Sequence, residues 1–84
     1  MAKKIAWTDQ AKADIRAIDR ETALDLLQRL ARFLRTGQGD VKRLQEIDPP
    51  EFRLRVGDYR VRYYDHDDAI EILRVLHRKD VYRS

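Results

Sequence analysis

The sequence contains no cysteine, and its 84 residues include one tryptophan, two prolines and three glycines. The absence of cysteine excludes a disulfide framework, a cysteine-ligated zinc ion and a thiol nucleophile. No apolar run approaches the roughly 20 residues that a membrane span requires. The charged start of the chain is not followed by an apolar segment of signal-peptide length. We therefore expect a soluble, cytoplasmic protein without a membrane partner.

The length suits one compact domain over residues 1–84. A domain of this size buries only about 60–65% of the surface of its unfolded chain, so the core is thin. A partner that covers apolar surface would add stability.

Charge is the main bulk feature. Charged residues make up 39% of the chain, and the net charge is +3. The acidic residues are scattered, whereas four arginines gather between Arg53 and Arg62. Basic patches attract phosphate polymers, so this segment is the first candidate for a binding surface.

The N-terminal half predicts a strand and a helical hairpin. Residues 3–7 alternate polar and apolar side chains, as a short strand does, and Thr8 or Asp9 can cap the helix that follows. The apolar stripe of that helix consists of Ala11, Ile15 and Ile18. A second helix is predicted from a cap between Asp19 and Thr22 to Gly37, where glycine suits a left-handed helix terminus. Its stripe contains Leu24, Leu27, Leu30, Ala31 and Leu34, widened by Leu26 and Phe33.

Residues 38–50 are predicted to be irregular, with turn chemistry at Gly39 and at residues 48–50. We expect three apolar side chains of this segment to be buried in the core, those of Val41, Leu44 and Ile47. After residue 50 the hydrophobic period changes from helical to two, which is typical of strands.

Strands over residues 52–56 and 59–64 flank Gly57 and Asp58, a pair that suits a tight two-residue turn with glycine first. A further turn at residues 65–68 leads to a third strand over residues 69–76. Strict alternation in this strand would place Arg74 on the same face as Ile70 and Ile72. Either a bulge shifts the register or both faces are partly covered.

The turn fixes the register of the hairpin. Apolar and aromatic residues face the helices in opposed pairs, namely Val56 with Tyr59, Leu54 with Val61, and Phe52 with Tyr63. The other face holds Arg55 opposite Arg60 and Arg53 opposite Arg62, and Glu71 is expected opposite Arg62. Opposed like charges destabilise a sheet. The surface is either a solvated charged face or a polyanion site, and the fit of arginine to phosphate oxygens favours the second.

The stretch from Phe52 to Val61, FRLRVGDYRV, closely resembles the RelE/ParE toxins, and the ending from Arg74 to Arg83, RVLHRKDVYR, strengthens the resemblance. The resemblance implies an α+β fold. A small antiparallel sheet, formed by the short N-terminal strand and the three-stranded C-terminal meander, would carry the N-terminal helical hairpin on one face. It also implies a toxin of a type II toxin–antitoxin system, closer to RelE, that a cognate antitoxin wraps and neutralises.

RelE toxins cut mRNA in the ribosome, without a metal or another cofactor, by attack of a ribose 2′-hydroxyl on the adjacent phosphate. The resemblance implies that Arg53 and Arg55 hold the RNA backbone. It implies that Arg60 and Arg78 stabilise the strained phosphate, and that Tyr82 stacks on a base or helps to deprotonate the hydroxyl.

Three further residues are RNA-binding candidates. Arg62 belongs to the arginine-bearing face, and Tyr64 is available for stacking if Tyr63 points into the core. Histidine ordinarily titrates near neutral pH, which makes His77 a candidate, although a strand-end histidine pointing to solvent is the simpler interpretation. The aspartates around His66 are more typical of a turn than of a metal site.

The sequence thus predicts a ribosome-dependent mRNA endonuclease that inhibits translation. Its partners would be the ribosome, mRNA and a cognate antitoxin, with higher-order toxin–antitoxin complexes. Two alternatives stay open. One is a ParE-like inhibitor of DNA gyrase without nuclease activity, since residues 74–77 look ParE-like whereas Arg78 to Tyr82 look RelE-like. The other is a catalytically inert protein of this fold that binds only its antitoxin.

Overall fold

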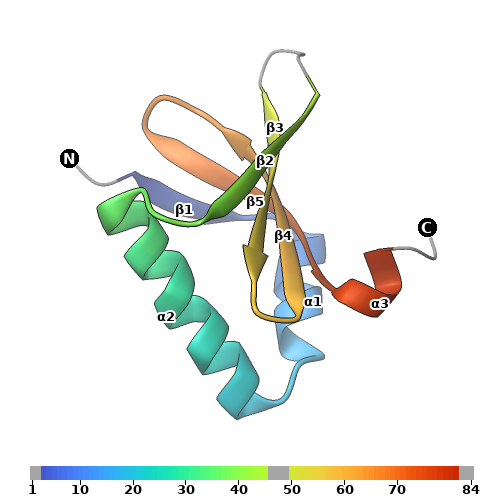
Figure 1. Cartoon of the computed structure of the whole chain (residues 1–84). Coiled ribbons are helices and arrows are strands. Elements are labelled where there is room, and N and C mark those ends of the chain that lie inside the picture. Colours follow the sequence, from blue (N-terminus) through green and yellow to red (C-terminus); the bar gives the residue numbers. More distant parts are fainter. Residues whose placement is uncertain (1–2, 46–49, 82–84) are drawn as a thin grey trace.

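The computed structural model describes residues 3–45 and 50–81. Within them the elements follow in the order β1 (Lys4–Trp7), α1 (Asp9–Arg16), α2 (Arg20–Thr36), β2 (Asp40–Gln45), β3 (Glu51–Val56), β4 (Tyr59–Asp65), β5 (Ala69–His77) and α3 (Arg78–Val81). The strands form one sheet in the order β1-β5-β4-β3-β2. Figure 1 shows α2 as the long oblique helix beside this sheet, and α3 directly after β5.

The helix caps lie where the sequence predicts them. The Thr8 hydroxyl accepts a hydrogen bond from the Ala11 amide at 3.2 Å, and Asp19 Oδ2 accepts one from the Thr22 amide at 3.0 Å. Gly37 ends α2 in the left-handed region, with φ 73°, and its amide donates to the Phe33 carbonyl at 2.7 Å. A side chain would be strained at this φ, which explains the glycine.

The buried stripe of α2 differs from the predicted one. Ala23, Leu26 and Leu30 are its buried residues, whereas Leu24 is 50% exposed. Leu24 shares the spacing of the stripe, but the sheet lies against the neighbouring side of the helix. The prediction that Leu24 belongs to the core was wrong.

One hydrophobic core lies between the helices and one face of the sheet. Its buried members are Ala11, Leu26, Leu30, Leu54, Val56, Val61, Tyr63, Ile70, Ile72 and Val75. Partly buried Ile5, Trp7 and Phe52 pack against it, as their alternation predicts. The helical hairpin therefore covers the core face of the sheet and does not cover the opposite face of the β3–β4 hairpin.

Residues 40–45 were predicted to be irregular, but they form β2, an edge strand antiparallel to β3. The sheet therefore has five strands among the described residues and not the predicted four. Val41 and Leu44 are each 37% exposed and do not dip into the core, and Ile47 lies outside the described residues. An edge strand with little burial shows a weak hydrophobic period, which is why the pattern missed it.

The sheet is mixed and not purely antiparallel. β1 pairs parallel with β5, with Lys4 opposite Ala69 and Trp7 opposite Ile72. The expectation of antiparallel pairing is confirmed for the meander β3 to β5 and corrected for β1. The two ends of the chain are thereby joined in one layer.

A bulge lies in β5. Tyr63 of β4 pairs with Ile72, but the preceding Arg62 pairs with Arg74, so Leu73 is the extra residue. Val75 therefore returns to the core, where it is 4% exposed. Of the two explanations that the sequence left open, the shifted register is the correct one.

The α1 helix holds this bulge from the side. Asp14 Oδ2 accepts hydrogen bonds from the Val75 amide and from Arg74 Nε, both at 2.9 Å. The pairing of β1 ends at Ile72, so Asp14 satisfies an amide that β1 does not reach. The Thr8 hydroxyl closes the same edge by donating to the Ile72 carbonyl at 2.7 Å.

We expect Asp14 to make the fold sensitive to acid. Partial burial alone raises the pKa of this carboxyl, but hydrogen bonds from Arg74, Val75 and Gln10 outweigh it and hold the pKa below its ordinary value of 3.8. A lowered folded pKa adds stability above the unfolded value, and that stability is lost as the pH falls through the folded pKa. Urea unfolding from neutral pH to below about pH 4 should therefore show a smaller acid-dependent loss in Asp14→Asn than in the parent chain.

The control for this experiment is Asp25→Asn. Asp25 pairs with Arg29 on the exposed side of α2, where its side chain is 60% exposed. This variant should keep the acid dependence of the parent chain. An unchanged acid dependence in Asp14→Asn would show that Asp14 does not carry the effect.

Candidate nucleic-acid interface

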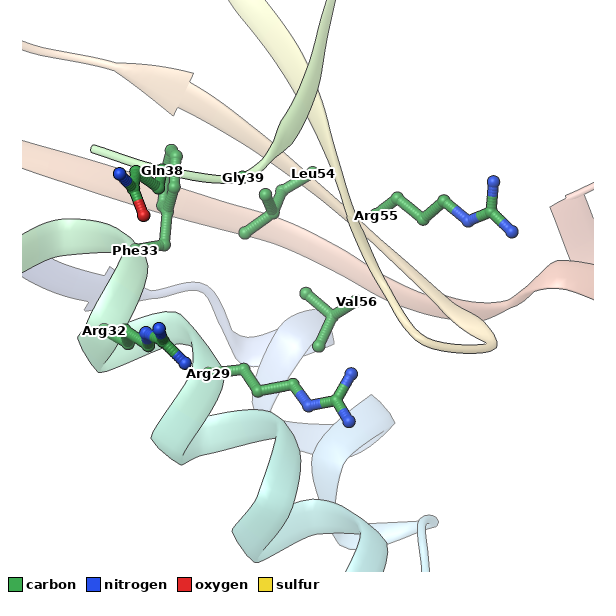
Figure 2. A pocket seen from close by; sticks show the side chains of 8 residues that line it. All are labelled: Arg29, Arg32, Phe33, Gln38, Gly39, Leu54, Arg55 and Val56. Carbon is green, nitrogen blue, oxygen red and sulfur yellow. The ribbon is translucent and has the colours of Figure 1, made fainter. Parts of the chain in front are cut away.

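The hairpin register agrees with the prediction at every pair. Gly57 has φ 58°, whereas Asp58, like every other described non-glycine residue, has a negative φ. The turn therefore has glycine at its first position. Arg55 lies opposite Arg60, and Arg53 lies opposite Arg62. We call the face that carries these four residues the arginine face. Figure 2 shows Leu54 and Val56 pointing toward α2, whereas Arg55 points away from it.

The arginine face continues across four strands. Lys42 of β2 pairs with Arg53, Arg53 with Arg62, and Arg62 with Arg74 of β5. Adjacent strands lie about 4.8 Å apart, so these cations form one row across the sheet. The sequence interpretation missed Lys42 because it treated residues 38–50 as irregular. The polar–apolar alternation of Asp40, Val41 and Lys42 was the signal for a strand there.

Counter-charges neutralise only one part of this row. Arg62 Nη2 donates to Glu51 Oε1 at 2.5 Å, and Arg74 is held by Asp14. Glu51 is 4% exposed and is the buried acidic residue among those described. The sequence placed Glu71 opposite Arg62, which was wrong, because the bulge pairs Glu71 with Tyr64. Glu71 Oε1 instead lies 3.0 Å from His66 Nε2.

The cations nearest the β2 edge have no such partner. Among the described residues, Lys42, Arg53 and Arg55 form no ion pair, and the buried Nε of Arg53 makes no hydrogen bond. Because this Nε is buried, an incoming anion would meet the terminal nitrogens of the Arg53 guanidinium group. Free positive charge is thus concentrated at Lys42, Arg53 and Arg55.

Arg60 and Arg78 each form hydrogen bonds with residues of the β3–β4 turn. Arg60 Nη1 donates to the carbonyls of Gly57 at 3.2 Å and Tyr59 at 3.1 Å. The Arg78 amide donates to the Asp58 carbonyl at 2.7 Å, and Arg78 Nε lies 3.7 Å from Asp58 Oδ1. An arginine side chain carries five donors, so both guanidinium groups retain donors for an incoming anion.

The aromatic and histidine candidates are more dispersed. Tyr64 pairs with Glu51, at the end of β4 away from the turn, and its ring is 6.5 Å from that of His66. His77 pairs with Tyr59, so its register places it on the core face and not on the arginine face. Its ring stands edge-on to Tyr59 at 5.3 Å, and its Nδ1 accepts from the Lys79 amide at 3.2 Å.

Acid–base groups are scarce at this site. Tyr82 lies outside the described residues. Burial, followed by the charge of Asp65, raises the pKa of Tyr63 to about 12, so this tyrosine stays protonated in the core. No group of three carboxylate or imidazole side chains within residues 3–45 and 50–81 is arranged to hold a metal ion. The chemistry that the described side chains offer here is that of arginine donors, which suit phosphate oxygens.

A groove lies on the other side of β3, between this strand and α2. Its volume is about 470 Å³. Phe33, Leu54 and Val56 form an apolar floor, and Arg29 and Arg32 reach it from α2, as Figure 2 shows. Apolar surface flanked by arginines suits a segment that carries both apolar and acidic side chains.

Several solved toxin structures share this fold. The RelE–RelB complex from Pyrococcus horikoshii matches with a TM-score of 0.76 and 22% identity over 93% of this chain and 97% of that chain. The RelBE2 complex from Mycobacterium tuberculosis matches with a TM-score of 0.77 and 22% identity over 92% and 99% of the two chains. The ParDE system from P. aeruginosa matches with a TM-score of 0.59 and 19% identity over 90% and 96%. The fold is therefore that of the RelE/ParE toxins.

The sequence itself matches the family model of the ParE toxin of the type II toxin–antitoxin system parDE over residues 5–82. The chain belongs to this family, and with it to the RelE/ParE superfamily of type II toxins. No curated protein matches the sequence. None of the described helices is long and apolar enough to span a membrane.

Proposed function

We propose that this toxin is an mRNA endonuclease that acts on the ribosome and inhibits translation. The observation that supports it is the arginine face, where three cations without ion pairs, Lys42, Arg53 and Arg55, adjoin the two arginines at the β3–β4 turn. The three cations would bind the phosphate backbone of the RNA. The two arginines at the turn would stabilise the negative charge of the phosphate that reacts.

In the proposed reaction the 2′-hydroxyl oxygen of a ribose attacks the adjacent phosphorus. The hydroxyl proton is lost, the bond to the 5′-oxygen of the next nucleotide breaks, and that oxygen takes up a proton. The products are a 2′,3′-cyclic phosphate and a 5′-hydroxyl. Arg60 and Arg78 stabilise the charge that develops on the phosphate, because arginine donors at a phosphate act in the transition state. Arginine is a poor acid or base, so Tyr82 or a group of the ribosome would move the protons.

A weak acid–base set suits an enzyme whose substrate is aligned by something else, since positioning alone removes several kcal/mol from a barrier. The ribosome would supply that alignment. A cognate antitoxin would be the second partner, with an apolar and acidic segment in the groove between α2 and β3 and further acidic residues on the arginine face. Higher-order toxin–antitoxin complexes would follow from that pairing.

Lys42 should contribute to RNA binding as a backbone contact. We expect Lys42→Ala to weaken binding of single-stranded RNA to a similar extent for different sequences, because a phosphate contact carries no sequence information. The slope of log affinity against log salt should decrease by about 0.7 for the lost contact. Fluorescence anisotropy with RNA that carries 2′-O-methyl groups measures this without cleavage.

Lys12→Ala is the matched control, since Lys12 is an exposed lysine on α1, and α1 packs on β5, three strands from β2 in the sheet. It should leave the salt slope close to that of the parent chain. Equal slopes in both variants would mean that Lys42 lies outside the RNA path.

The function is tested in a cell-free translation reaction with purified toxin, in which the 5′ ends of the mRNA are mapped by primer extension. Discrete cuts that require ribosomes are the expected result. Intact mRNA together with undisturbed translation would overturn the proposal.

A second candidate, inhibition of DNA gyrase without nuclease activity, is favoured by the match to the ParE family model. A supercoiling assay with purified gyrase distinguishes the two functions. Loss of supercoiling at toxin concentrations that leave translated mRNA intact would support the gyrase inhibitor.

A further inference from the structure

The two arginines at the β3–β4 turn are attached to it in different ways. Arg60 donates to main-chain carbonyls, which any residue in the turn would supply. Arg78 is anchored through its amide to the Asp58 carbonyl at 2.7 Å, but its guanidinium group faces the Asp58 side chain, with 3.7 Å between Nε and Oδ1. Among the described residues, the Asp58 carboxylate is thus the charged partner of the Arg78 side chain.

Asp58 is well placed to direct Arg78. It occupies the second position of a turn whose first position, Gly57, supplies the positive φ of 58°. The last pair between β4 and β5 joins Tyr59 to His77, one residue away on each strand. Both residues of the ion pair thus stand on backbone that the sheet holds in place.

We propose that Asp58 is a positioning residue, whose carboxylate holds the Arg78 guanidinium beside Arg60 for a common phosphate. The inference rests on the proposed function, because it assigns the two arginines to one phosphate. Asp58 contacts no reacting atom and acts through Arg78.

Folding stability does not explain this pair. The Arg78 and Asp58 side chains are 57% and 66% exposed, and an exposed ion pair contributes little to stability. An aspartate at this position also weakens the attraction of the arginine face for a polyanion, since it adds negative charge beside Arg78. In this proposal, the orientation that the Asp58 carboxylate gives to Arg78 compensates for the weaker attraction of the polyanion.

Binding and rate should therefore change in opposite directions in Asp58→Asn. Asparagine keeps the turn preference and the size of the side chain but removes the charge. The RNA should bind as tightly as to the parent chain or more tightly, because the surface becomes more basic. The maximal rate of single-turnover mRNA cleavage on programmed ribosomes should fall about tenfold, because a misplaced catalytic group lowers the rate without weakening binding.

Two further variants complete the experiment. Asp58→Glu restores the charge and, with its longer reach, should restore most of the rate. Asp9→Asn makes the same change of charge in the first turn of α1, outside the arginine face. It should leave the maximal rate unchanged.

A measurement independent of cleavage follows Arg78 directly. The Nε–Hε signal of Arg78, assigned with Arg78→Lys, should show a restricted side chain in the parent chain by ¹⁵N relaxation, and a mobile one in Asp58→Asn. Equal mobility in both chains would overturn the proposal, even if the parent toxin cleaves no RNA. Absence of cleavage by the parent toxin would contradict the proposed function alone.

The pH profile separates positioning from direct participation. A positioning residue leaves the pH dependence of the cleavage rate unchanged in Asp58→Asn, and this is the expected result. Loss of the acidic limb of the profile would identify Asp58 as a general base and overturn the proposal. A parallel fall in rate and affinity in Asp58→Asn would also overturn it, because that pattern indicates a lost binding contact.

Discussion

Replacing Arg60 with alanine should lower the maximal rate of ribosome-dependent mRNA cleavage by about 10²–10³-fold, as expected when one donor to a developing negative charge is removed. Arg60 Nη1 donates to the carbonyls of Gly57 and Tyr59, which orients the side chain and leaves the donors on Nη2 and Nε for the phosphate in this proposal. The measurement is single-turnover cleavage at saturating toxin. Arg78→Ala should act in the same direction.

Arg60 and Arg78 act on one phosphate in this proposal, so their effects should not be additive. The double variant should lose less than the product of the two single losses. Arg20→Ala is the matched control, because Arg20 is an exposed arginine at the start of α2. Its rate should equal that of the parent chain. A rate in Arg60→Ala within a few-fold of the parent would remove Arg60 from the catalytic site.

Glu51→Gln should lower the free energy of unfolding by about 2–3 kcal/mol. Glu51 is 4% exposed and accepts a short hydrogen bond from Arg62 Nη2, whose loss leaves a charged group without its partner. Breaking a fully buried pair costs roughly 3–5 kcal/mol, and the smaller figure applies because the Arg62 side chain is 42% exposed and can be rehydrated. Urea unfolding followed by circular dichroism measures the change.

The same substitution should strengthen RNA binding. Loss of the Glu51 charge leaves Arg62 as an additional free cation in the row with Lys42 and Arg53. Glu71→Gln is the control, since Glu71 carries the same charge, is 39% exposed and lies beside His66. It should change stability by less than about 1 kcal/mol. If Glu51→Gln were as stable as Glu71→Gln, the Glu51–Arg62 pair would not support the fold.

The hairpin could be predicted from the sequence because its information is local. Gly57 and Asp58 specify the turn, and the turn fixes every cross-strand pair between β3 and β4, which places Arg53 and Arg55 on one face. The helix caps at Thr8 and Asp19 were predictable for the same reason. Each of these features depends on residues within a few positions of one another.

The features that the sequence did not predict depend on distant contacts. The bulge in β5 is held by Asp14, about 60 residues earlier in the chain, through the Val75 amide. The counter-charge of Arg62 is Glu51 and not Glu71, because the bulge moves Glu71 along β4. Alternation within one strand cannot reveal such a partner.

The candidate site also contains some residues whose position the sequence predicted and others whose position it did not. The residues carried by the hairpin, Arg53, Arg55 and Arg60, lie together as the pattern predicts. Lys42 was missed because β2 has little burial, and His77 was assigned to RNA although the shifted register turns it to the core face. The roles of all these residues in RNA cleavage stay predictions for the experiments above.

The parallel pairing of β1 with β5 has a consequence for the timing of folding during synthesis. Ile5 leaves the ribosome 65 residues before its partner Ile70. The core cannot form until β5 has emerged, because this strand contributes Ile70, Ile72 and Val75 to it. The junction between Arg78 and the β3–β4 turn cannot form earlier either. Contacts between such distant segments form slowly and late. The helices and β1 therefore remain without their apolar partner surface until β5 joins them, and the domain folds as one late event rather than element by element.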